Sequence, residues 1–306
     1  MRPLKFHPIL KQTLWGGERI IPYKELASGL SRVGESWELS GMPGSESVVA
    51  EGPWAGSTLS ELIGRFGAEL LGKANYARFG QEFPLLVKFI DAREDLSIQV
   101  HPDDELARKR HGKSGKCEMW YVLEAEPGAS LLTGFSRPIA PAEYERRVAD
   151  NTLTDVLNRQ AIASGDVFYL PAGRVHSIGK GSFIVEIQQS SDITYRIYDF
   201  DRRDAAGNSR ELHTELAREA IDFESSENSR ITYAPENNQE VRLVTTPYFT
   251  TSLYTLTART RCDWSATDSF VAIVLLQGSG SLTDNEGNRI DVRPVSYTHL
   301  RAHETL

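Results

Sequence analysis

Four side chains in three strand-like stretches have the types that bind a divalent metal ion. Gln99 and His101 alternate with apolar residues, so both lie on one face of a predicted strand. Glu118 opens a second strand-like run, and His176 follows a third strand and its Pro-Ala-Gly turn. Imidazole nitrogens together with carboxylate and amide oxygens suit zinc, or another divalent ion such as manganese or iron. We predict a metal held by His101, Glu118 and His176, with Gln99 as a fourth candidate ligand and one position open for water or substrate.

The strand that carries Gln99 and His101 also permits a purely structural interpretation. Polar residues at a period of two are typical of the solvated face of an antiparallel sheet. On that interpretation neither side chain binds a ligand. Glu118 and His176, which complete a set of metal-binding types, favour the metal site.

Arg196 marks a second stretch that could do chemistry. It lies between Tyr195 and Tyr198, in a run of β-forming residues that begins near Gln188. An exposed edge strand with a salt-bridged arginine would produce the same pattern. From the residues alone, both interpretations of Arg196 stay open.

Strands dominate the elements that must position these side chains. Residues 84–90 form an apolar run of strand length that only Lys88 interrupts. Residues 96–101 alternate between apolar and polar, and residues 166–176 and 182–189 have the pattern of a strand pair. The sequence therefore predicts a mainly β protein.

Two stretches have the pattern of helices. Residues 58–73 begin with Thr58 and Glu61 at the spacing of a capping box and continue with apolar residues at helical spacing. This helix is expected to cover the sheet. Residues 141–160 predict a small helical insertion between the strands.

The C-terminal part of the chain is predicted to form a separate β unit. A polar linker over residues 228–240 precedes it. Its strands are expected at residues 241–244, 249–256, 270–276 and 281–283, with a hairpin turn at residues 284–288.

Composition excludes several classes of protein. The chain has 306 residues, 40% of them hydrophobic and 25% charged, which is ordinary for a globular protein. Its net charge of -8 argues against nonspecific binding of nucleic acid, which needs a basic face. We find no membrane-span pattern and no signal-peptide pattern. Cys117 and Cys262 are the only cysteines and do not form a disulfide framework. The expected compartment is the cytoplasm, and the expected state is a monomer or a weak homo-oligomer.

Six motifs, taken in their order and spacing, resemble the type I mannose-6-phosphate isomerases of the cupin superfamily, in the short form found in many bacteria. The resemblance covers roughly residues 1 to 294. The motifs are Trp15–Gly17, Gly34–Ser40, Leu96–Asp104, Gly115–Leu123, Leu170–Gly179 and Gln188–Asp199.

The resemblance implies a fold and a domain division. It predicts a cupin jelly-roll barrel with the small helical insertion, followed by a second, smaller β domain. The catalytic domain is expected over residues 1–235, and an incomplete cupin-like domain over residues 236–294. Residues 295–306 resemble the translation of a library adapter, so we expect this tail to be non-native and the second domain to be truncated.

The resemblance also assigns roles to residues. It implies one zinc ion per chain, or another divalent ion, and it makes Arg196 catalytic. Glu186, ten residues before Arg196, is implied as the base, a role that a carboxylate can fill if burial raises its pKa. Lys116 is the alternative proton shuttle. Ser97 and Lys88 correspond to positions near the phosphate of the substrate, although Lys88 could equally extend from the sheet toward solvent.

The implied activity is the interconversion of mannose 6-phosphate and fructose 6-phosphate through an enediol(ate), with a small-molecule sugar phosphate as the only expected partner. Two alternatives remain. One is another metal-dependent cupin enzyme, such as a dioxygenase. The other is a non-catalytic cupin that binds a sugar phosphate.

Overall fold

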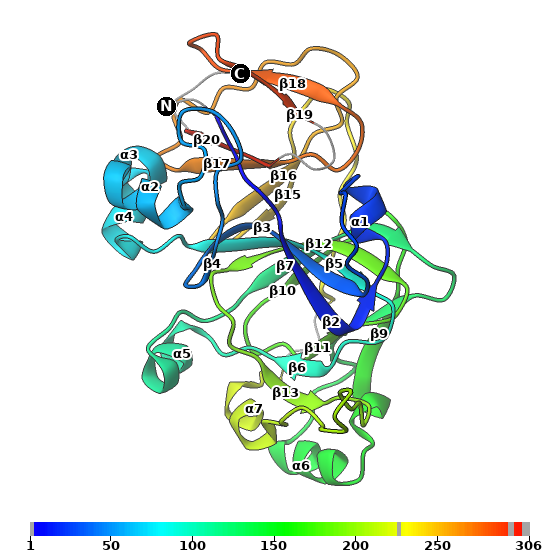
Figure 1. Cartoon of the computed structure of the whole chain (residues 1–306). Coiled ribbons are helices and arrows are strands. Elements are labelled where there is room, and N and C mark those ends of the chain that lie inside the picture. Colours follow the sequence, from blue (N-terminus) through cyan, green and yellow to red (C-terminus); the bar gives the residue numbers. More distant parts are fainter. Residues whose placement is uncertain (1–2, 225–227, 293–296, 302–306) are drawn as a thin grey trace.

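An eight-stranded antiparallel sheet forms the centre of the molecule (Figure 1). The computed structural model describes residues 3–224, 228–292 and 297–301. In spatial order the strands are β14 (Arg230–Ile231), β10 (Val167–Leu170), β7 (Glu118–Ala125), β12 (Ser182–Gln189), β5 (Leu85–Ala92), β2 (Ile9–Gly17), β3 (Val33–Met42) and β4 (Ser45–Glu46). The prediction of a mainly β chain is confirmed.

A second, five-stranded sheet faces the first. Its order is β13 (Tyr195–Tyr198), β6 (Ile98–Val100), β11 (His176–Ile178), β8 (Ser130–Phe135) and β9 (Leu157–Ala161). An inner hydrophobic core fills the space between the two sheets and includes Ile90, Trp120, Leu131 and Ile184. Residues of β5 and β12 alternate between this inner core and an outer one, so β5 is buried on both faces.

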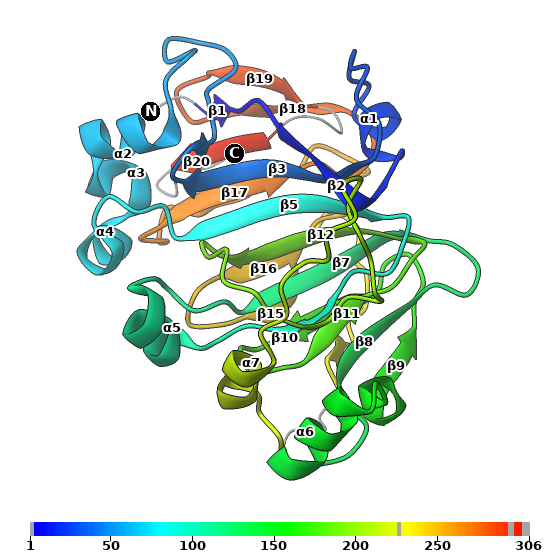
Figure 2. The ribbon, with the colours of Figure 1, turned by 60° about the horizontal axis from the view of Figure 1, so that its bottom comes forward.

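The helices lie around the sheets (Figures 1 and 2). They are α1 (Ile20–Tyr23), α2 (Leu59–Phe66), α3 (Ala68–Leu71), α4 (Lys73–Phe79), α5 (Asp104–His111), α6 (Pro141–Ala149) and α7 (Thr214–Ala220), with a 3-10 turn at Leu153–Val156. The predicted capping box is confirmed, because Thr58 Oγ1 accepts from the backbone N–H of Glu61 and the Glu61 carboxylate accepts from that of Thr58.

Three predictions about elements are wrong in part. The helical insertion ends before residue 157, because residues 157–161 form β9 and pair with β8. Strands β10 and β12 do not pair with each other; each pairs with β7, which lies between them. Alternation over residues 96–101 predicts Leu96 on one face with Ile98 and Val100. Instead Leu96 packs in the inner core and the other two pack on the outer face of the five-stranded sheet, since β6 begins only at Ile98.

The C-terminal strands pack beyond the outer face of the eight-stranded sheet. They are β15 (Val241–Thr245), β16 (Thr250–Leu253), β17 (Phe270–Val274), β18 (Gly280–Thr283), β19 (Arg289–Val292) and β20 (Tyr297–Arg301), and β20 also pairs with β1 (Leu4–Lys5). The predicted hairpin at residues 284–288 is confirmed by the β18–β19 pairing.

The proposed domain border at residue 235 stays a prediction. Leu243, Phe249 and Phe270 belong to the same hydrophobic core as the outer face of the large sheet. Of the expected non-native tail, residues 295–296 and 302–306 lie outside the described residues. Within the described residues, no helix is long and apolar enough to cross a membrane.

Candidate active site

Three strands bring His101, Glu118 and His176 together inside the barrel. Each residue is buried, and one ligand atom from each lies within 4.8 Å of the others. His176 Nε2 is 3.2 Å from Glu118 Oε1, and His101 Nε2 is 3.6 Å from Glu118 Oε2. Glu118 and His176 are the first residues of β7 and β11, and His101 directly follows β6, so all three lie at strand ends.

Backbone carbonyls orient both imidazole rings. His101 Nδ1 lies 2.8 Å from the carbonyl oxygen of Ile193, and His176 Nδ1 lies 2.8 Å from that of Arg174. Because a carbonyl only accepts, each Nδ1 carries the proton, and each Nε2 turns its lone pair toward Glu118. Burial, together with Lys116, lowers the pKa of His101 well below its usual range, and burial lowers the pKa of His176. Both rings are therefore neutral and ready to act as ligands.

The surroundings of the Glu118 carboxylate indicate whether His101, Glu118 and His176 fit a metal ion. Its side chain is 1% exposed, and neither oxygen has a hydrogen-bond partner of acceptable geometry among the described residues, although Lys116 Nζ lies 2.7 Å from Oε2. Lys116 compensates Glu118 Oε2 and His101 Nε2, but Glu118 Oε1 and His176 Nε2 are two acceptors 3.2 Å apart, which repel unless a cation lies between them. The three residues therefore fit a divalent ion.

Gln99 lies beside the group but does not present its oxygen to it. It pairs with His176 across β6 and β11, and its Nε2 lies 3.3 Å from His176 Nε2. Its Oε1 accepts from the hydroxyl of Ser97, which is buried, at 3.2 Å. A half-turn of the amide exchanges the two atoms. Gln99 can join the metal ligands only after that rotation.

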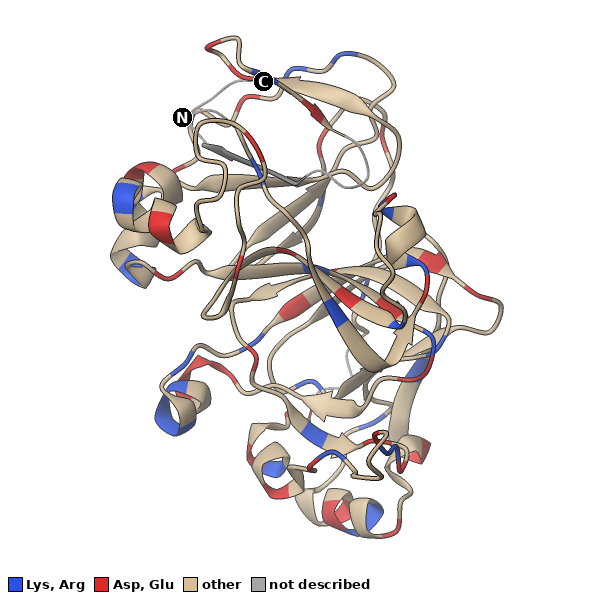
Figure 3. Cartoon of the chain, viewed as in Figure 1, with Lys and Arg blue, Asp and Glu red and all other residues tan. Residues whose placement is uncertain are grey.

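Alternating charges continue from the metal-binding group along the inner face of the large sheet. Lys116 Nζ lies 3.0 Å from His101 Nε2 and 3.8 Å from Glu186 Oε1. Glu186 Oε1 then lies 2.9 Å from Lys88 Nζ, because the two residues are register partners on β12 and β5. Figure 3 shows acidic and basic residues side by side on these central strands. The candidate acid–base residues therefore form one connected, buried array.

The condition set for Glu186 as the base, a pKa raised by burial, is not met. Burial raises its pKa, but the ion pairs with Lys88 and Lys116 outweigh burial and lower it below the ordinary carboxyl range. Burial by itself would lower the pKa of Lys88, but the carboxylates of Glu186 and Glu35 outweigh burial, so the pKa of Lys88 is raised. Lys88 is 8% exposed, so it does not extend to solvent.

Three residues of the array were not predicted from the sequence. Trp120 Nε1 donates to Glu186 Oε2 at 2.8 Å, Trp37 Nε1 donates to Glu35 Oε2 at 2.6 Å, and Glu35 lies 3.9 Å from Lys88 Nζ. Trp120 follows Glu118 by two residues, so strand alternation could have placed both on the inner face.

Arg196 lies on the same row of the small sheet as the metal-binding group. It pairs with Gln99, and Gln99 pairs with His176. Its neighbours Tyr195 and Ile197 pack in the outer core, so Arg196 points inward. Its Nη1 donates to the carbonyl of Glu211 at 3.0 Å, while its buried Nε has no hydrogen-bond partner among the described residues. This donor is available to a ligand in the barrel.

Known proteins share both the sequence and this architecture. Residues 4–132 match the family described as phosphomannose isomerase type I, catalytic domain. The mannose-6-phosphate isomerase ManA of Bacillus subtilis is 34% identical over 288 residues, covering 93% of this chain and 88% of that protein. The chain belongs to the type I phosphomannose isomerase family.

Other members of the family are similar to this chain over comparable lengths. The mannose-6-phosphate isomerase of Streptococcus mutans is 34% identical over 284 residues, covering 92% of this chain and 87% of that protein. A crystal structure of the Bacillus subtilis mannose 6-phosphate isomerase has a TM-score of 0.89 and 29% identity, covering 100% of this chain and 96% of that one. The resemblance drawn from the motifs and the cupin fold class are confirmed.

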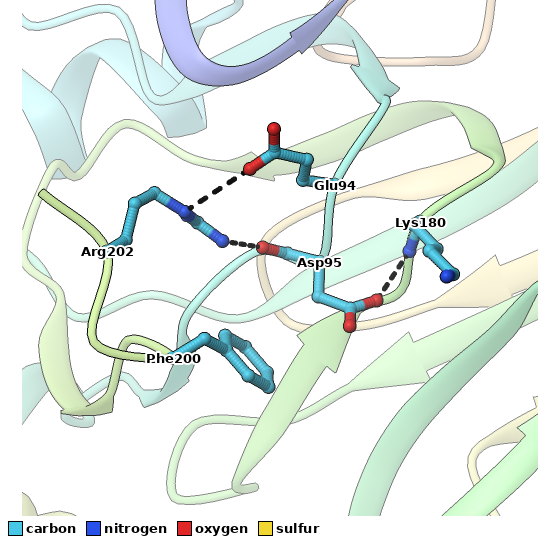
Figure 4. A pocket seen from close by; sticks show the side chains of 5 residues that line it. All are labelled: Glu94, Asp95, Lys180, Phe200 and Arg202. Atoms are coloured by element: carbon cyan, nitrogen blue, oxygen red, sulfur yellow. Dashed lines mark hydrogen bonds and ion pairs between the residues drawn. The ribbon is translucent and has the colours of Figure 1, made fainter.

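This phosphomannose isomerase family member also has a surface cavity of about 380 Å³. Figure 4 shows its lining side chains, which are Glu94, Asp95, Lys180, Phe200 and Arg202. Arg202 donates to the carbonyl of Asp95 and lies 3.7 Å from Glu94 Oε2. Glu94 and Asp95 precede β6 whereas His101 follows it, so the cavity lies at the opposite end of that strand from the metal-binding group.

Proposed function

We propose that this chain interconverts mannose 6-phosphate and fructose 6-phosphate, with zinc as its metal. The observation that carries the proposal is the buried His101–Glu118–His176 group, joined to Lys116 and Glu186 in one array within the fold of the mannose isomerase family. This isomerisation moves a proton between C1 and C2 of the open-chain sugar through an enediol(ate). Such a reaction needs an electrophile, a base and a positioned cation.

His101, Glu118 and His176 would hold a divalent ion, which would supply an electrophile for the carbonyl and hydroxyl oxygens of the sugar. Arg196 places a fixed positive charge on the facing sheet, where it stabilises the charge of the enediolate. Arg196 and the metal ligand His176 lie in one row of the small sheet, on either side of Gln99, which pairs with both.

Glu186 is the proposed base. Lys88 and Lys116 keep it ionised, so it is ready to accept a proton, while the same lysines limit its basicity. Lys116 contacts both Glu186 and Glu118, and its proposed role is to exchange a proton with a substrate oxygen. Ser97 and Lys88 remain the proposed contacts of the phosphate end.

A coupled assay tests this function. Purified protein is given mannose 6-phosphate, and fructose 6-phosphate is measured before chelation, after chelation and after zinc is added back. We expect activity to vanish on chelation and to return with zinc. A folded, zinc-loaded protein that binds mannose 6-phosphate without turnover would overturn the proposal and favour a sugar-phosphate-binding protein.

Arg196→Ala separates metal binding from catalysis in the same assay. We expect zinc to remain bound and kcat to fall by about a hundredfold or more, because a donor to the developing negative charge is lost. Arg159→Ala is the matched control, since Arg159 is exposed on β9 at the other edge of the same sheet. An unchanged kcat in Arg196→Ala would remove Arg196 from the mechanism.

A further inference from the structure

The short segment before β7 determines where Lys116 and Glu118 lie. Its backbone is hydrogen-bonded at almost every residue. The N–H of Lys116 donates to the carbonyl of Pro102 at 3.1 Å, and the carbonyl of Ser114 accepts from the hydroxyl of Ser191 at 2.9 Å. Residues 114–116 carry no regular secondary structure, so these bonds replace the ladder that β7 provides from Glu118 onward.

Asp104, in the first turn of α5, accepts a hydrogen bond from this segment. Its Oδ1 accepts from the N–H of Gly115 at 2.9 Å and from Gln189 Nε2 at 3.0 Å. Burial raises the pKa of Asp104, but the hydrogen bonds from Gly115, Gln189 and Tyr248 outweigh burial and lower it. The carboxylate is therefore an ionised acceptor for several donors at once.

Gln189, at the end of β12, bonds to the backbone of the same segment at Cys117. Its Oε1 accepts from the N–H of Cys117 at 2.9 Å, and its own N–H donates to the carbonyl of Cys117 at 3.2 Å. Gln189 is 3% exposed, so water does not replace these bonds easily. Both backbone polar groups of Cys117, the residue just before Glu118, are thus bonded to Gln189.

The C-terminal unit reaches the same network. Tyr248 lies in the turn between β15 and β16, and its hydroxyl donates to Asp104 Oδ2 at 3.2 Å. Thr246 Oγ1 fixes that turn by accepting from the N–H groups of Tyr248 and Phe249 at 3.0 and 2.9 Å. Figure 2 shows the β15–β16 hairpin beside α5.

We propose that Asp104 and Gln189 are positioning residues for the metal-binding group and Lys116, and that Tyr248 extends this role to the C-terminal unit. None of the three contacts the ligand atoms. They act by fixing the backbone from which Lys116 and Glu118 project, and small displacements of such groups weaken metal binding and catalysis steeply. The catalytic part of this inference rests on the proposed isomerase function, whereas the metal-binding part does not.

Gln189→Leu tests the inference by removing the side-chain bonds at nearly constant volume. We expect the zinc dissociation constant, measured by competition with a chelator, to rise about tenfold. We expect kcat to fall while KM stays near that of the wild type. Gln160→Leu is the matched control, because Gln160 also bonds through its amide, to Thr133 Oγ1 at 2.7 Å, but on β9.

Tyr248→Phe provides a second variant that removes a single hydroxyl and leaves the folded core intact. We expect zinc affinity to fall on the order of threefold. Tyr233→Phe is its control, since the Tyr233 hydroxyl bonds the carbonyl of Gly165 at 2.7 Å, away from this network. Wild-type zinc affinity in both Gln189→Leu and Tyr248→Phe would overturn the inference. A wild-type protein that binds zinc without turnover would instead overturn only the proposed function.

Discussion

At the scale of single residues, neighbouring buried groups of the candidate site end in different charge states. Burial lowers the pKa of His101 and His176, and Lys116 lowers that of His101 further, so both rings are neutral and suited to ligate a metal. Glu186 is equally buried, but Lys88 and Lys116 hold it ionised. The residue types were readable from the sequence, whereas the charge state of each depends on partners that come from other strands.

Glu186 should make the protein sensitive to acid. Its pKa is lower in the folded protein than in the unfolded chain, so below the ordinary carboxyl value of about 4.3 the unfolded chain gains a proton that the folded protein does not. Stability from this group is complete above that pH and is lost progressively as the pH falls toward about 2.

The melting temperature of the metal-free protein, recorded by circular dichroism over this pH range, checks the expectation. Glu186→Gln should have a lower melting temperature than the wild type at pH 7. Its melting temperature should fall less on acidification, because the variant has no carboxylate to protonate at this position. Glu124→Gln, on the exposed part of β7, should follow the wild type. Parallel curves for the wild type and Glu186→Gln would contradict the assignment.

At the scale of elements, alternation within a strand was the most reliable guide. It placed Gln99 and His101 on one face, and both lie beside His176. It failed for Leu96, where β6 has not yet begun. Strand partners could not be read from alternation, since β10 and β12 share a pattern but are separated by β7.

Gly115→Ala should disturb the segment that leads into β7. A Cβ at this position would lie 2.4 Å from the carbonyl carbon of Asp103 and 2.5 Å from the nitrogen of Asp104. Both are backbone atoms and cannot move independently of α5. We expect a loss of about 1–3 kcal/mol in the free energy of unfolding, together with weaker zinc binding.

Urea unfolding and chelator competition measure these two effects. Gly29→Ala is the control, because a Cβ there meets nothing within 4 Å. If Gly115→Ala matched Gly29→Ala in both measurements, the close packing of this segment would have no energetic consequence.

At the scale of the whole molecule, the C-terminal strands share a hydrophobic core with the large sheet and also bond to its helices. Asp268 accepts from the N–H groups of Lys73 and Ala74 at 2.7 and 3.0 Å, and so caps α4 from a distant part of the chain. Phe83 and Phe270 pack with ring centroids 4.8 Å apart. These contacts predict that the two parts unfold together.

Asp268→Ala should cost about 1 kcal/mol in the free energy of unfolding, since it leaves two helix N–H groups without their cap. Asp263→Ala is the control, because Asp263 accepts from the N–H of Ser265 in its own loop. Urea unfolding followed by tryptophan fluorescence and by circular dichroism measures the loss and the number of transitions. Two separated transitions in the wild type would show that the C-terminal strands unfold independently of the first part.

The sequence by itself determined the kinds of groups at the site and the fold class. Ligand types, strand alternation and the capping box at Thr58 are local properties, and local chemistry specifies them. Only the tertiary structure decided which strands pair, that Trp37 and Glu35 join the array, and that Asp104, Gln189 and Tyr248 meet. Apart from the bond between Trp37 and Glu35, these contacts join residues far apart in the chain, as the ion pair of Glu35 with Lys88 does, and their geometry follows from the packing of whole sheets rather than from the pattern within any one segment.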